Sequence, residues 1–85
     1  MGNDITYWEL DQYQLGLFTT YCSQNSIPVP TFKPYNGLFY LEQNTANLAA
    51  YGQVFEDFDF EDGDLGNSFG TRSWSTSMVP SVLWP

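Results

Sequence analysis

The stretch TFKPYNGLFYLEQ, residues 31–43, decides the fold. Two extended runs, residues 31–35 and 38–43, flank the pair Asn36-Gly37. An Asn-Gly pair between two such runs is the strongest short signal for a β-hairpin with a two-residue turn. Pro34 lacks a backbone N–H, which confines the first run to the edge of a sheet. The sequence therefore predicts an edge hairpin that turns at Asn36-Gly37.

A helix is predicted before this hairpin, over residues 6–23. Thr6 and Glu9 have the spacing of a capping box, and Asn3 or Asp4 are alternative caps. At helical spacing the apolar residues form two stripes on opposite sides, Leu10, Tyr13, Leu17 and Tyr21 on the first and Trp8, Leu15, Phe18 and Cys22 on the second. Two outcomes remain open for the second stripe: the C-terminal half of the chain covers it, or it contacts a partner.

Further elements follow the hairpin. Asn44 and Thr45 predict the cap of a short helix that ends near Gly52. In residues 53–62, Phe58 and Phe60 alternate with acidic residues, which predicts a half-buried strand with an acidic outer face. A turn over residues 62–67 and a last strand over residues 71–79 complete the expected sheet.

These elements predict an α+β fold, with one N-terminal helix packed on a small antiparallel sheet. The chain is loop-rich, and its length fits one small domain over residues 1–85. Residues 79–85 form an apolar C-terminal tail. We expect this tail to close the core or to contact another chain, with Trp84 as its anchor, because an exposed indole forfeits its burial energy.

The composition favours a folded protein that binds another protein. Hydrophobic residues make up 42% of the chain and aromatic residues 19%, whereas charged residues are only 14%. So many aromatic rings exceed what one small core encloses comfortably, and surface aromatics are enriched at interfaces. A core that prefers large residues is the alternative. The predicted aromatic contact residues are Trp8, Phe18, Trp74 and Trp84.

The charge balance limits the class of partner. Ten acidic residues face two bases, Lys33 and Arg72, which gives a net charge of −8. Nucleic acids and anionic membranes are bound through Lys and Arg that neutralise phosphate, so direct binding to either is disfavoured. The expected partner is another protein with a basic or apolar surface.

The residues that carry most enzymatic chemistry are missing. The chain contains no histidine, and its one cysteine, Cys22, can form neither an internal disulfide nor a zinc site. No glycine-rich phosphate loop is present. The acids from Asp57 onward fail the calcium-loop pattern, since the sixth position is Asp62 and the twelfth is Ser68. We therefore expect no enzyme, no cofactor and no standard metal site, although an irregular oxygen site stays open.

The sequence carries no signal for export or for a membrane. The N-terminus lacks a positive region, and no apolar run is long enough to span a bilayer. We expect a soluble protein in the cytoplasm of a host cell or in a virion.

Two functions fit these expectations. The first is a small accessory or structural subunit of a larger assembly such as a phage particle. The alternative is a phage-type inhibitor that mimics nucleic acid and blocks the basic groove of a nuclease, a glycosylase or a CRISPR complex. On a strand, alternate carboxylates lie about 6.6 Å apart along one face. The residues of this phosphate-like row are Glu56, Asp57, Asp59, Glu61, Asp62 and Asp64.

Overall fold

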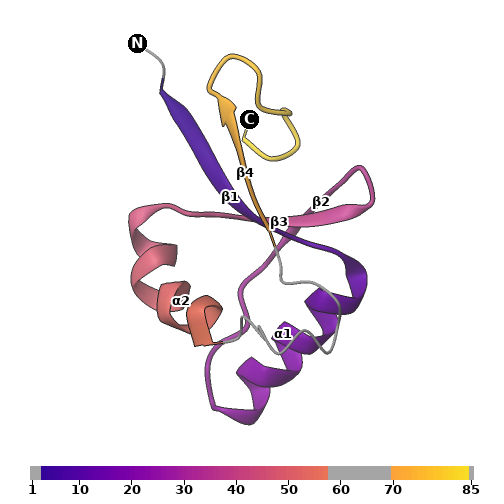
Figure 1. Cartoon of the computed structure of the whole chain (residues 1–85), viewed down its shortest axis with the longest axis vertical. Coiled ribbons are helices and arrows are strands. Elements are labelled where there is room, and N and C mark those ends of the chain that lie inside the picture. Colours follow the sequence, from indigo (N-terminus) through magenta and orange to yellow (C-terminus); the bar gives the residue numbers. More distant parts are fainter. Residues whose placement is uncertain (1–2, 58–69, 85) are drawn as a thin grey trace.

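The predicted α+β class is confirmed by a computed structural model, which describes residues 3–57 and 70–84 (Figure 1). In chain order the elements are β1 (Asp4–Leu10), α1 (Gln12–Gln24), β2 (Lys33–Tyr35), β3 (Leu38–Glu42), α2 (Thr45–Asp57) and β4 (Gly70–Ser75). The strands form one antiparallel sheet in the order β2-β3-β1-β4. Among the described strands, β1 is thus an inner one, and β2 and β4 lie at the two edges.

The hairpin forms where the sequence predicts it. Tyr35 pairs with Leu38, and the two residues between them have positive φ angles, 54° at Asn36 and 83° at Gly37. Asparagine and glycine adopt this conformation at low cost, and it matches the twist of the paired strands. Pro34 lies in the short edge strand β2, also as expected.

The predicted N-terminal helix is wrong in its first third. Residues 4–10 form a strand, and α1 begins after Asp11. Asp11 and Gln14 make the capping box: the Gln14 N–H donates to Asp11 Oδ1 at 2.8 Å, and the Asp11 N–H donates to Gln14 Oε1 at 3.0 Å. The β-branched and aromatic residues before this cap favour a strand. Thr6 and Glu9 therefore belong to β1, and they are not a cap.

The second helix is longer than predicted. It passes Gly52 and ends at Asp57, so Val54–Asp57 is helical where the acidic strand was expected to start. Asn44 caps it as predicted, since Asn44 Oδ1 accepts from the Asn47 N–H at 2.7 Å. Phe58, Phe60 and the rest of that expected strand lie outside the described residues. The last strand is also shorter than predicted and ends at Ser75, before a turn.

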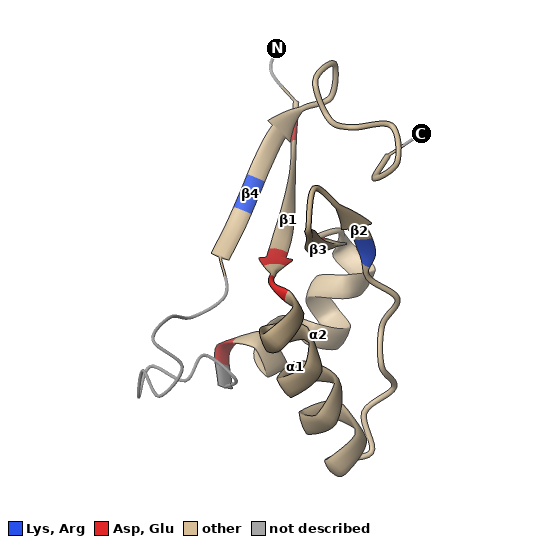
Figure 2. Ribbon diagram, turned by 90° about the vertical axis from the view of Figure 1, so that its right-hand side faces the viewer, with Lys and Arg blue, Asp and Glu red and all other residues tan. Residues whose placement is uncertain are grey.

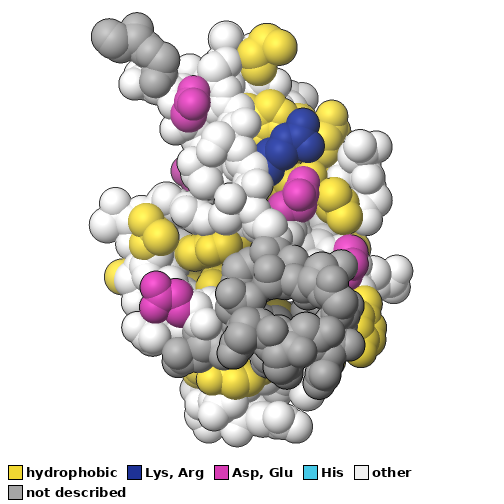
Figure 3. Space-filling view, viewed as in Figure 1, with side chains coloured by type: hydrophobic (Ala, Val, Ile, Leu, Met, Phe, Trp, Pro, Cys, Tyr) yellow, Lys and Arg dark blue, Asp and Glu magenta, His cyan; other side chains and the backbone are white. Residues whose placement is uncertain are grey.

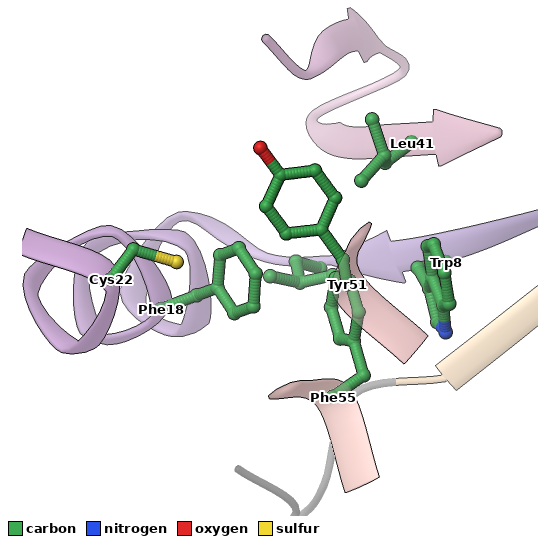
Figure 4. Packing of buried hydrophobic residues seen from close by; sticks show 7 residues of the cluster. Trp8, Phe18, Cys22, Leu41, Tyr51 and Phe55 are labelled. Atoms are coloured by element: carbon green, nitrogen blue, oxygen red, sulfur yellow. The ribbon is translucent and has the colours of Figure 1, made fainter. Parts of the chain in front are cut away.

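The two helices cover one face of the sheet, and aromatic rings fill the space between the helices and the sheet (Figure 4). Phe55 of α2 lies between two aromatic rings, with ring centroids 4.1 Å from Trp8 and 4.4 Å from Phe18. The main core cluster comprises Trp8, Leu10, Phe18, Cys22, Leu41, Tyr51 and Phe55. The second apolar stripe of the predicted helix is thus covered at Phe18 and Cys22, whereas Tyr13 of the first stripe is exposed.

A smaller cluster lies on the opposite face of the sheet. Side chains alternate along a strand, so Tyr7 points away from Trp8 and its helical layer. Tyr7 and Tyr40 are covered there by Leu83 from the C-terminal segment, which we define as residues 76–84. This segment therefore completes the fold, as the sequence predicts for the apolar tail.

The anchor of the segment differs from the one predicted. Leu83 is 1% exposed, whereas Trp84 is 42% exposed. The backbone turn from Pro80 explains the difference, because adjacent side chains point in different directions and only one reaches the tyrosines. Leu83 is therefore the fully buried anchor of the segment, and the indole is covered only in part.

Replacing Leu83 by alanine is expected to lower the free energy of unfolding by about 2 kcal/mol, since it removes a buried aliphatic side chain. Met78→Ala, at a side chain that is 71% exposed, is the control and is expected to change it by less than about 0.5 kcal/mol, and Trp84→Ala is compared with Leu83→Ala. Urea denaturation followed by circular dichroism measures these values. A larger loss in Trp84→Ala than in Leu83→Ala would contradict this assignment.

Candidate interaction surface

The C-terminal segment presents three large apolar side chains to solvent. Met78, Val82 and Trp84 are all exposed, while Leu83 between the last two is buried. The other exposed large apolar side chains of the described residues lie apart from one another along the chain, at Tyr13, Val29, Tyr35 and Leu48. Exposed apolar groups gathered on one short segment are typical of a protein-binding surface.

Backbone hydrogen bonds give this segment a defined shape. The N–H groups of Met78 and Val79 both donate to the Ser75 carbonyl, at 2.9 and 3.1 Å. The N–H groups of Leu83 and Trp84 donate to the Pro80 carbonyl, at 3.0 and 3.1 Å. Two successive turns thus fix which side chains point inward and which point outward.

A basic side chain from the hairpin holds the segment against the sheet. Lys33 Nζ donates to the Leu83 carbonyl oxygen at 3.1 Å. Figure 2 shows that the two bases lie on the two edge strands, one on β2 and one on β4. The two basic side chains, Lys33 and Arg72, therefore lie on opposite edges of the sheet.

The second base, Arg72, belongs to a polar and aromatic cluster beside the same face. Its guanidinium lies 4.7 Å from the centre of the Trp74 ring, and its Nη1 lies 3.8 Å from Glu9 Oε2. The same carboxylate oxygen accepts a 2.6 Å hydrogen bond from the Tyr40 hydroxyl. In Figure 3 the basic side chain on the visible face lies among hydrophobic and acidic side chains. Glu9 thus joins three strands of the sheet.

The tyrosines of this face hold their protons tightly. Burial, followed by the hydrogen bond to Glu9, raises the pKa of Tyr40 to about 12. Burial and the charge of Glu42 raise the pKa of Tyr7 as well. The buried Tyr7 hydroxyl has no hydrogen-bond partner among the residues that the structure describes, a state that costs about 1–3 kcal/mol. Both phenols therefore stay neutral at physiological pH.

The predicted aromatic contact residues separate into two groups. Trp8 and Phe18 are buried in the main core, where both stack on Phe55, so neither projects from the surface. Trp74 is half-buried against Tyr7, with ring centroids 5.6 Å apart. Trp84 is the one member of the predicted set that is exposed.

Of the predicted acidic row, the structure describes only the first two residues, Glu56 and Asp57. Glu56 is exposed near the end of α2, and Asp57 is the last residue of that helix. Asp59, Glu61, Asp62 and Asp64 lie outside the described residues. A strand spacing of carboxylates therefore does not apply to Glu56 and Asp57.

Sequence reasoning missed the role of Glu9, because this residue was assigned to a helix cap. The signal that identifies its place is the alternation in β1, where Tyr7 and Glu9 share one face and Trp8 shares the other with Leu10. Recognising that strand would have placed Glu9 beside the tyrosines of the hairpin.

A hollow of about 380 Å³ lies between α2 and the end of the sheet. Its lining includes Trp8, Leu48 and Phe55, and Glu56 is the one ionisable side chain among the described residues that line it.

Within residues 3–57 and 70–84, no group of three or more His, Cys, Asp or Glu is placed to hold a metal ion. Cys22 is buried, and burial raises the pKa of its thiol.

Comparisons with protein-family models, with curated proteins and with solved structures find no match to this chain. In the part of the chain that the structure describes, neither helix has the length and apolar character needed to cross a membrane.

Proposed function

We propose that this protein is a non-enzymatic, protein-binding subunit of a larger assembly, such as a phage particle. One observation carries the proposal: a segment anchored by Leu83 holds Met78, Val82 and Trp84 exposed. A tryptophan on an ordered segment contributes strongly to binding, because little conformational freedom is lost when it is buried. The partner surface that fits these side chains is apolar.

The nucleic-acid mimic draws less support from the described residues. Its row of carboxylates needs a strand, whereas the first two members, Glu56 and Asp57, are in α2. The net charge of −8 remains its main support. We therefore rank the assembly subunit first.

Replacing Met78, Val82 and Trp84 together by serine is expected to weaken partner binding at least about a hundredfold, since hot-spot side chains each contribute about 2 kcal/mol or more. The partner is first identified by affinity capture from the native source and mass spectrometry, and then purified for calorimetry. The control is Tyr13→Ser with Leu48→Ser, which removes exposed apolar side chains elsewhere. Unchanged melting temperatures are expected for both variants.

Salt dependence distinguishes the two functions. Apolar contacts are expected to persist between about 50 and 500 mM salt, whereas charge pairs are screened over about 8 Å at physiological ionic strength. A complex that dissociates with salt, and that is lost when Asp57, Asp59 and Glu61 become amides, would contradict the subunit and favour the mimic.

A further inference from the structure

The two edges of the sheet are protected unequally. Strand β2 has only three residues and contains Pro34, so its edge offers little to a pairing strand. Strand β4 has six residues without proline, and its residues from Gly70 to Ser73 are exposed. Its one charged side chain, Arg72, is directed to Glu9 and Trp74. Long exposed edges without such protection are templates for another strand.

The register identifies which backbone groups of β4 face outward. The Thr76 N–H donates to the Asn3 carbonyl at 3.0 Å, and this pair continues the β1–β4 register. Hydrogen-bonded pairs alternate along an antiparallel ladder, so Gly70, Arg72 and Trp74 also bond to β1. Thr71, Ser73 and Ser75 then direct their N–H and C=O groups away from the sheet.

Almost all of those outward groups have no hydrogen-bond partner among residues 3–57 and 70–84. The Ser75 carbonyl accepts from Met78 and Val79 in the following turn. Within the described chain, no hydrogen bond reaches the other outward groups, which are both groups of Thr71 and Ser73 and the Ser75 N–H. The edge thus offers three donors and two acceptors at the spacing of a β-ladder.

A carboxylate oxygen defines the chemistry beside this edge. Glu9 Oε2 is used by Tyr40 and Arg72, but none of the described residues bonds to Glu9 Oε1. That second oxygen lies 3.7 Å from the position that a Cβ atom would take on Gly70. The Glu9 side chain is 23% exposed, and Gly70 has no side chain to cover it.

We propose that β4 binds an extended segment of a partner protein as a fifth strand of the sheet, antiparallel to β4. The segment carries Lys or Arg opposite Gly70, where its ammonium or guanidinium reaches Glu9 Oε1, and an apolar residue opposite Trp74. Residues opposite Gly70 and Trp74 fall at non-hydrogen-bonded positions, where cross-strand side chains are closest. This inference rests on the proposed protein-binding function and specifies the partner's chemistry.

The net charge supports the choice of occupant. The chain has an excess of eight negative charges, which attracts a basic segment and opposes the approach of a second copy. Both of its own bases are engaged, Lys33 with Leu83 and Arg72 with Glu9 and Trp74. The partner must therefore supply the positive charge.

The test uses the full chain and a synthetic capped peptide, Val-Thr-Val-Thr-Lys extended by one threonine at each end. Amide hydrogen exchange by NMR is expected to show about tenfold slower exchange at Thr71, Ser73 and Ser75 when the peptide saturates the protein. The amides of Arg72 and Trp74 bond to β1 already and serve as internal controls, with little change. A peptide with Glu in place of Lys is expected to bind at least about tenfold more weakly.

A matched pair of variants tests the backbone contact. Ser73→Pro removes one outward N–H while sparing the backbone bonds to β1, and is expected to weaken peptide binding about tenfold. Both Ser73→Pro and Ser73→Ala lose the side-chain hydrogen bond to Thr6, so the comparison isolates the N–H. Ser73→Ala keeps the N–H and is expected to bind normally. Unchanged exchange at the three outward amides, equal binding of the Glu peptide, or protection that appears without peptide as the protein dimerises would each overturn the proposal. These outcomes do not involve Met78, Val82 or Trp84, so they leave the test of the proposed function separate.

Discussion

Replacing Phe18 by alanine is expected to lower the free energy of unfolding by about 4 kcal/mol, which is the largest effect of any single substitution proposed for this protein. Phe18 is fully buried, and its ring stacks on Phe55 and meets the edge of Phe32 at a centroid distance of 5.6 Å. Small domains have a total stability of about 5–15 kcal/mol, so much of it depends on this one ring.

The control for this prediction lies on the same helix. Tyr13 is 60% exposed, and Tyr13→Ala is expected to change the free energy of unfolding by less than about 0.5 kcal/mol. Both variants are measured by urea denaturation at equal protein concentration. Similar losses in the two would mean that α1 packs on the sheet through a different face.

Raising the pH from about 9 to about 12 is expected to destabilise the fold by about 2 kcal/mol through Tyr40 alone. The pKa of Tyr40 is about 12 in the fold and near its ordinary value of 10.0 in the unfolded chain. Between these two values the unfolded chain has lost the phenolic proton while the fold retains it, so stability falls as pH rises. Below about pH 10 this contribution is fully present.

Tyr40→Phe separates this effect from general alkaline damage. The variant loses the hydrogen bond to Glu9, which is expected to lower stability by about 2 kcal/mol at pH 7, but its stability should fall less steeply above pH 10. Tyr13→Phe, at an exposed position, is the control and should keep the full alkaline loss. Urea denaturation across this pH range measures both slopes. A Tyr40→Phe slope equal to that of the unmodified protein would exclude Tyr40 as the titrating group.

The hairpin was predictable because its signal is local. Asn36 and Gly37 are adjacent, and their tolerance of positive φ fixes the turn and the register of β2 and β3 without reference to the rest of the chain. The cap at Asn44 is local for the same reason.

The first strand was missed because both of its faces are buried. Tyr7 faces the C-terminal segment and Trp8 faces the helices, so β1 lacks the apolar–polar alternation that marks a half-exposed strand. Trp8 and Leu10 then fit helical stripes by coincidence. The helical end of α2 depends on Phe55 stacking with Trp8, a contact between residues far apart in sequence that local patterns do not contain.

The sequence identified the C-terminal tail as part of the candidate surface, but it did not predict which of its side chains point inward and which point outward. An apolar run predicts that at least one of its side chains is buried, but it does not say which one. The turn at Pro80 decides that Leu83 is buried while Trp84 is exposed. The role of Glu9 was equally out of reach, because it joins β1 to strands that lie far from it in the sequence.

The inner position of β1 also determines when the protein can fold during synthesis. Strand β1 is made before either of its partners, since it pairs on one side with β3 and on the other with β4, where Ile5 meets Trp74. Until residues 70–84 have been made, β1 has one open edge and Tyr7 lacks its cover. Pairings this distant in sequence slow folding. Until these residues follow, the growing chain therefore exposes an unpaired edge of β1 and an uncovered tyrosine, to which a chaperone would bind.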